Sequence, residues 1–182
     1  MVYIILGKGF EETEAVAPGD VLRRAQIPMQ YAGVGGRLIE GAHGITVQAD
    51  ITVEEMDLAD MDMIVLPGGM GGVESMEGSR TVLQAVEYAL THDKYVAAIC
   101  AAPTILGKRG WIDGRHAVCY PGMEQQMGKA IVHPEQEAVV DGKLITGRAP
   151  GAAIEFGLRM AGALPGSFTP DEVAGYMVYD RK

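Results

Sequence analysis

The chain has 182 residues and a formal net charge of −9 at pH 7, from 15 lysines and arginines against 24 aspartates and glutamates. This length fits one domain, residues 1–182. The acidic balance, with no basic run longer than two residues, disfavours a nucleic-acid partner. Two cysteines exclude a disulfide scaffold, and the first apolar run, Val2 to Leu6, is too short for a signal peptide or a membrane span. We therefore expect a cytoplasmic protein that does not bind membranes.

Apolar runs alternate with amphipathic segments along the whole chain. Short apolar runs predict buried strands, and apolar residues at helical spacing predict helices. The expected strands are residues 2–6, 29–32, 44–47, 63–66, 96–99, 116–120, 138–140 and 144–146, and the expected helices are residues 12–25, 81–91, 101–106, 152–161 and 171–179. Such alternation predicts an α/β fold, a doubly wound and mostly parallel sheet flanked by helices.

The first expected helix begins with three acidic residues, Glu11, Glu12 and Glu14. Carboxylates near a helix N-terminus interact favourably with its dipole, which explains them without a function. Alternatively, one of them faces a site, because the loops that follow parallel strands gather at one edge of the sheet. Further along this helix, Pro18-Gly19 predicts a kink or a break, and the expected inner face is Val16, Val21 and Leu22.

Two glycine-containing segments predict turns. Residues 67–72 are rich in glycine and are expected to form a loop that brings backbone N–H groups close to a ligand or anion. This loop has neither the ending of a Walker motif nor the spacing of a dinucleotide fingerprint, so a plain turn is the alternative. Asp141-Gly142 lies between two expected strands and predicts a type I′ hairpin turn.

Cys100 lies at the junction of an expected strand and an expected helix. Ala98 and Ala102, two residues before and after it, are small, as the sharp turn of a nucleophile elbow requires. Pro103 fits the first turn of a helix. A thiol at a helix N-terminus is favoured as the thiolate. The alternative is a small buried residue at the end of a strand, since free cysteines are commonly buried.

Four segments in order along the chain closely resemble the ThiJ/PfpI family. They are Lys8 to Glu14, Leu66 to Gly69, Ala97 to Pro103 and Asp141 to Gly151, and together they span almost the whole chain. The match is nearest the Parkinson-disease-protein branch. The resemblance implies a flavodoxin-like sandwich of the class I glutamine-amidotransferase type with a cysteine at its elbow.

The resemblance also implies roles for four residues. Cys100 matches the reactive cysteine of the family, and Glu14 matches the carboxylic acid that hydrogen-bonds this thiol. Glu14 must be protonated when Cys100 is a thiolate, because two adjacent anions repel each other. Gly69 and Ala101 match positions whose backbone N–H groups form an oxyanion pocket.

Three further residues depart from the family pattern or lie beside the expected site. Tyr120 stands where some members of this branch place a histidine, and Ala101 stands where the protease-like relatives have one, which argues against a protease. His43 matches a segment near the partner subunit, where it either helps to line a site or is an ordinary surface residue. Cys119 is expected to fill the core; its alternative role is to resolve an oxidised Cys100 through a disulfide.

The sequence leads to two main functional hypotheses. In the first, a Cys100 thiolate attacks a reactive carbonyl such as methylglyoxal, or its early adducts on protein side chains, as in a glyoxalase or deglycase, and Glu14 moves the proton. In the second, Cys100 is oxidised to a sulfenic or sulfinic acid, and the protein is an oxidative-stress sensor or a redox-regulated chaperone. A protein that only retains the fold is a third alternative. We expect a homodimer, no organic cofactor and no metal ion.

Overall fold

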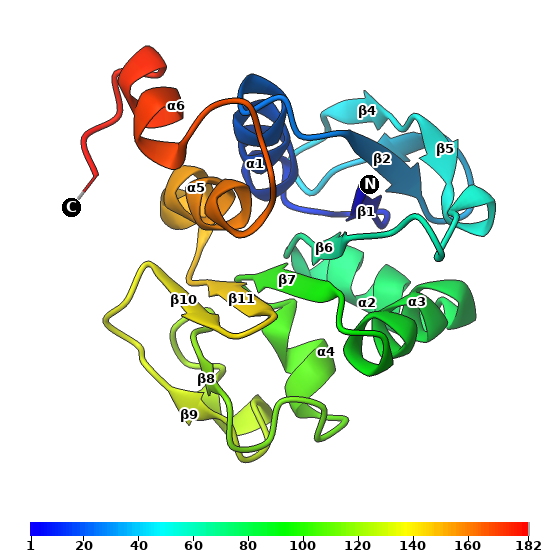
Figure 1. Cartoon of the computed structure of the whole chain (residues 1–182). Helices are drawn as coiled ribbons and strands as arrows, with labels where there is room; N and C mark the ends of the chain where they lie inside the picture. Colours follow the sequence, from blue (N-terminus) through cyan, green and yellow to red (C-terminus); the bar gives the residue numbers. More distant parts are fainter. Residues whose placement is uncertain (182) are drawn as a thin grey trace.

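A seven-stranded sheet is the centre of the computed structural model, which describes residues 1–181 (Figure 1). All neighbouring strands are parallel except for the hairpin of β10 and β11. In sheet order the strands are β10 (Ala138–Asp141), β11 (Leu144–Gly147), β7 (Tyr95–Ile99), β6 (Met63–Leu66), β1 (Val2–Leu6), β2 (Met29–Gly33) and β5 (Ile51–Thr52). Counted among the main parallel strands, β2-β1-β6-β7-β11 is the flavodoxin order 2-1-3-4-5, which confirms the predicted fold class.

Helices cover both faces of this sheet (Figure 1). On one face lie α1 (Glu12–Arg24) and α5 (Ala153–Ala163), which pack against each other, with α6 (Pro170–Tyr176) against α5. On the other face lie α2 (Met70–Gly78) and α3 (Arg80–Thr91), while α4 (Pro103–Gly107) follows β7. Because both faces are covered, every residue of β1 and β6 is buried, as their continuous apolar runs predict. Within residues 1–181, no helix is long and apolar enough to cross a membrane.

Short elements complete the fold outside the main layers. The pair β3 (Leu38–Glu40) and β4 (Thr46–Gln48) is an antiparallel hairpin, close to the strand expected at residues 44–47. The pair β8 (His116–Ala117) and β9 (Ile131–Val132) is parallel. Three single turns of 3₁₀ helix occur at Val53–Glu55, Glu124–Gln126 and Pro150–Ala152.

Two segments differ from the sequence prediction in secondary structure. The expected loop at residues 67–72 ends in helix α2, which begins at Met70. Gly72 permits this, because a Cβ there would lie 2.7 Å from Phe10 Cα, so only a glycine lets the helix approach the loop after β1. The strand expected at residues 116–120 ends at Ala117. Val118 N–H donates to Thr146 Oγ1 instead of to a neighbouring strand.

Helix α1 is continuous through Pro18, so the predicted break is wrong. Its inner face is also rotated from the expected one: Val21 and Leu22 are fully buried, but Val16 is 44% exposed. Pro18 itself is buried against α5, where a Cβ on Gly157 would lie only 3.0 Å from Pro18 Cα. The close approach of two helices therefore selects the face of α1 that turns inward.

The turn between β10 and β11 is also different from the predicted one. Asp141 pairs with Leu144 in the strand register, so the two loop residues are Gly142 and Lys143 rather than Asp141 and Gly142. Of these two, Gly142 has a positive φ of 57° and Lys143 does not. A positive φ at the first loop position only is the requirement of a type II′ turn, whereas type I′ needs it at both.

The contact between Gly157 and Pro18 gives a test of this packing. We expect Gly157→Val to lower the free energy of unfolding by about 1–3 kcal/mol, because the added side chain has no space between α1 and α5. Gly175→Val in α6 is the matched control, since no atom lies within 4 Å of a Cβ at that position. Urea unfolding of both variants measures the difference; equal stabilities would contradict the packing argument.

Candidate active site

Cys100 is held in a strained backbone conformation directly after β7. Its φ is +65°, a left-handed conformation that is uncommon for a residue other than glycine. Two hydrogen bonds fix this turn: Cys100 N–H donates to Gly147 O at 2.9 Å, and Cys100 O accepts from Tyr120 N–H at 2.8 Å. The neighbours Ala98 and Ala102 are completely buried. This is the geometry of the predicted nucleophile elbow.

The helix that follows the elbow is too short to supply a strong dipole. Helix α4 has five residues, and Ala101-Ala102 form a turn before it, where helix was expected. The Thr104 hydroxyl, which is completely buried, donates to Ala101 O at 2.7 Å and holds this turn. The chemistry of Cys100 therefore depends mainly on the groups that surround its sulfur atom.

Glu14 lies beneath Cys100 in the core. Its side chain is completely buried, Oε2 accepts a 2.8 Å hydrogen bond from Gly68 N–H, and Oε1 has no hydrogen-bond donor. The Cys100 side chain lies close to this carboxyl group and lowers its pKa against the rise that burial causes. Gly68 makes this contact possible, because a Cβ there would lie 2.5 Å from Glu14 Oε2 and 2.8 Å from Cys100 Cβ.

The thiol and the carboxyl group titrate as a coupled pair. Burial raises the pKa of Glu14 to about 7. Burial, and then the negative charge of Glu14, raise the pKa of Cys100 to about 12, while hydrogen bonds from Ala101 and Gly69 oppose this rise. The pair therefore loses its first proton near neutral pH and resists loss of the second. A thiolate at neutral pH requires that the remaining proton stays on Glu14, so the helix N-terminus alone does not produce it.

Backbone N–H groups converge on the sulfur atom from two strand ends. Those of Ala101 and Gly69 lower the pKa of Cys100 against the rise that burial causes, and an oxyanion pocket at these two positions stays a prediction. Gly69 has φ +82°, and a Cβ there would lie 2.5 Å from Gly9 O, so only glycine fits. An oxyanion formed on Cys100 would meet both donors.

A pocket of about 360 Å³ opens over Cys100. Of the predicted residues, Cys100, Gly69, Ala101 and Tyr120 line it, and Glu14 lies below its floor. The sequence analysis did not place the other four lining residues there: Glu11, Met70, Met123 and Pro150. Glu11, Met70 and Pro150 belong to segments already singled out, whereas nothing in the sequence distinguishes Met123 from a core methionine.

Two other predicted residues lie outside the pocket lining. Cys119 is buried and has no disulfide, and it follows the end of β8 instead of lying in a strand. Burial raises the pKa of its thiol to about 11. His43 is exposed, and its Nδ1 lies 2.8 Å from Glu12 Oε2 and 3.3 Å from Glu11 Oε2.

Glu11, Glu12 and His43 form a compact ionisable cluster at the rim of the pocket. Their ligand atoms all lie within 4.8 Å of one another, close enough to hold a metal ion. Hydrogen bonding to Glu12 raises the pKa of His43; burial opposes ionisation of Glu12, but hydrogen bonds, first from the His43 side chain, lower the pKa of Glu12. A cation bound here would compete with the contact between His43 Nδ1 and Glu12 Oε2. The sequence analysis missed the grouping because residues 31 positions apart form it.

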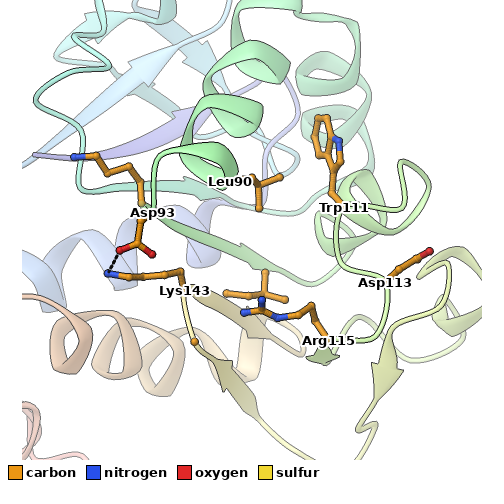
Figure 2. A pocket seen from close by; sticks show the side chains of 9 residues that line it. Leu90, Asp93, Trp111, Asp113, Arg115 and Lys143 are labelled. Carbon is orange, nitrogen blue, oxygen red and sulfur yellow. Dashed lines mark ion pairs between the residues drawn. The ribbon is translucent and has the colours of Figure 1, made fainter.

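A larger cavity, of about 510 Å³, lies at the opposite edge of the sheet (Figure 2). Lys94 precedes β7 and Leu144 begins β11, so this cavity borders the strand ends remote from Cys100. Two of its basic side chains are paired with acids: Lys143 with Asp93 at 3.7 Å, and Arg115 with Asp141. Neither cysteine lines this cavity, so the smaller pocket is the candidate active site.

The raised pKa of Glu14 predicts a pH-dependent stability. Between pH about 4.5 and about 7 the folded protein keeps a proton that an unfolded chain has released, so raising the pH through this range destabilises the fold. We expect wild type to lose up to about 3 kcal/mol relative to Glu14→Gln between pH 5 and pH 8. Urea unfolding at both pH values measures this difference. Parallel changes in the two proteins would show that Glu14 titrates normally.

Gly68 gives a second test of the buried pair. In Gly68→Ala the added methyl group would separate Glu14 from Cys100, so we expect a loss of about 1–3 kcal/mol in stability and a changed pH profile for alkylation of Cys100 by iodoacetamide. Gly78→Ala is the control, because no atom lies within 4 Å of a Cβ at that position, and it should change neither the stability nor the alkylation profile. An unchanged alkylation profile in Gly68→Ala would contradict the proposal that Gly68 makes room for the contact between Glu14 and Cys100.

Comparison with known proteins agrees with this architecture. A model of the DJ-1/PfpI family matches residues 1–163. The chain is 38% identical to Protein dj-1beta of Drosophila melanogaster over 173 residues, which cover 94% of this chain and 92% of that protein. It is 35% identical over 154 residues to a protein of Pyrococcus abyssi named a deglycase, covering 82% of this chain and 90% of the other.

Solved structures give the same result. The crystal structure of Drosophila melanogaster DJ-1beta matches with a TM-score of 0.91 and 34% identity, over 99% of this chain and 98% of the other. Toxoplasma gondii DJ-1, described as oxidized, matches with a TM-score of 0.92 and 30% identity over the same shares. On this evidence of sequence and structure, the chain belongs to the DJ-1/PfpI family.

Proposed function

We propose that the protein is a cysteine-dependent enzyme that converts reactive carbonyls such as methylglyoxal, or their early adducts on protein side chains, into hydroxy acids. The observation that carries this proposal is the strained elbow, which places Cys100 in a pocket above a buried acid that shares its proton. The deglycase name of the Pyrococcus abyssi relative supports the same class of substrate.

The first step is addition to the aldehyde carbon. The Cys100 thiolate forms a bond between sulfur and this carbon, and the carbonyl electron pair moves onto oxygen to give a hemithioacetal oxyanion. The N–H groups of Ala101 and Gly69 lie beside the sulfur atom and stabilise this charge. The proton remains on Glu14 during the attack, so the site carries one negative charge throughout.

The second step moves hydrogen within the adduct. The aldehyde carbon loses its proton and the neighbouring carbonyl carbon gains one, so the first carbon is oxidised and the second reduced without an external oxidant. Glu14 exchanges protons during this rearrangement. Water then cleaves the resulting thioester and releases lactate and the Cys100 thiolate, so the net reaction adds one water to methylglyoxal.

The pocket has Tyr120 in its lining, where a cysteine protease would need a histidine base. Tyr120 is half-exposed, and no histidine is among the residues of the lining. Cys100 therefore lacks an adjacent imidazole base, which a protease needs to protonate a leaving amine. Addition to an activated aldehyde has no such requirement.

A redox function is the second candidate. The oxidized state of the Toxoplasma gondii relative is a property of that protein, but the same buried acid would stabilise a sulfinate here by donating a hydrogen bond. In this case Cys100 would register oxidation or control a chaperone activity without metabolic turnover.

We further propose that the protein forms a homodimer, which sedimentation equilibrium tests.

Incubation with methylglyoxal separates these candidates. We expect wild type to form lactate and Cys100→Ser to form none, because the serine hydroxyl has no comparable anionic form at neutral pH. Cys119→Ala is the matched control and should retain the activity. Absence of turnover in wild type, together with a rapid gain of oxygen mass on Cys100 under mild peroxide, would contradict the enzyme proposal and favour the redox function.

A further inference from the structure

The pocket over Cys100 has one charged residue in its lining. Glu11 is that residue, and the other seven are apolar or uncharged, including Met70, Met123 and Tyr120. Among residues 1–181, no lysine or arginine lines this pocket, and Arg148, two positions before Pro150, is not among its residues. A substrate that carries a carboxylate or phosphate would therefore meet a negative charge and no cation.

The Glu11 side chain is fixed at the rim. It is mostly buried, with 14% of its side chain exposed, and its backbone N–H donates to Gly68 O at 3.0 Å. Its Oε2 lies 3.3 Å from His43 Nδ1. Glu11 is thus tied to the loop that also carries the Gly69 N–H, so its charge stays near the reacting sulfur atom.

His43 does not cancel this charge. The imidazole lies closer to Glu12, at 2.8 Å, and it is 68% exposed, where solvent screens its positive charge. Two carboxylates lie beside one imidazole, so the cluster keeps a net negative charge in either protonation state of His43. The N-terminus of α1 offsets about half a charge at most.

We propose that Glu11 selects substrates by charge, admitting neutral and cationic carbonyl compounds to Cys100 and rejecting anionic ones such as α-oxoaldehydes that carry a carboxylate. This inference rests on the proposed carbonyl chemistry for its biological meaning. The electrostatic filter itself acts on any reagent that approaches Cys100. Glu11 is a specificity residue here, and the chemical roles of Cys100 and Glu14 are unchanged.

Charged thiol reagents test the filter without requiring turnover. In a Cys119→Ala background Cys100 is the only thiol. Its thiolate attacks methanethiosulfonates, forms a mixed disulfide and releases methanesulfinate. The rate constants for reagents with a trimethylammonium-ethyl group and a sulfonato-ethyl group, each divided by that of the neutral methyl reagent, give a cation-to-anion preference that is independent of the thiolate fraction.

We expect Glu11→Gln to lower this preference by at least about threefold, because it removes one charge at the pocket rim. Glu54→Gln is the matched control: Glu54 is exposed and outside the pocket, and its substitution changes the net charge equally. An equal preference in Glu11→Gln and Glu54→Gln would overturn the proposal. Thermal unfolding confirms that both variants are folded.

The same variants separate this inference from the proposed enzyme activity. If methylglyoxal is turned over, the kcat/KM ratio of 4,5-dioxopentanoate, an anionic α-oxoaldehyde, to methylglyoxal should rise at least about threefold in Glu11→Gln and stay constant in Glu54→Gln. A shift in reagent preference without any turnover would support charge selection by Glu11 and contradict the proposed enzyme activity. Turnover with no shift in either ratio would support the enzyme activity and contradict charge selection by Glu11.

Discussion

The buried contact between Cys100 and Glu14 is the interaction on which the site depends. Removing both groups from water raises the pKa of each, and their proximity prevents both from ionising at once. The pair consequently loses its first proton near neutral pH and keeps its second proton well above it. Gly68 contributes by its lack of a side chain, because any Cβ would occupy the space between them.

Sheet topology brings this pair together. Glu14 follows β1, Gly68 follows β6 and Cys100 follows β7, and these three strands are adjacent and parallel. Loops at the carboxyl ends of such strands share one edge, and the flavodoxin order reverses direction between β1 and β6, where sites in these sheets form. The larger cavity at the other edge has none of these loops.

The rim of the pocket adds a second electrostatic element to the site. Glu11 and Glu12 begin the helix that also carries Glu14, so one acidic run supplies a buried acid, a rim charge and a partner for His43. The three carboxyl groups differ in their surroundings and therefore in their chemistry. Burial without a cation raises the pKa of Glu14, whereas the His43 contact lowers that of Glu12.

The sequence by itself determined the sheet and predicted the elbow at Cys100. Continuous apolar runs such as Val2–Leu6 define buried parallel strands, and small residues around Cys100 are a local steric requirement that a sequence displays directly. The pairing with Glu14 came from a family resemblance, because no local pattern joins residues 86 positions apart.

Only the tertiary structure decided which face of α1 turns inward, where α2 begins, and which residues surround the pocket. Gly157 lets α5 approach Pro18, so packing between helices overrides the effect of a proline inside α1. Contacts between distant segments likewise place Met70, Met123 and Pro150 over Cys100 and His43 beside Glu11. Such contacts depend on shape and distance after folding, which residue type and spacing along a chain do not encode locally.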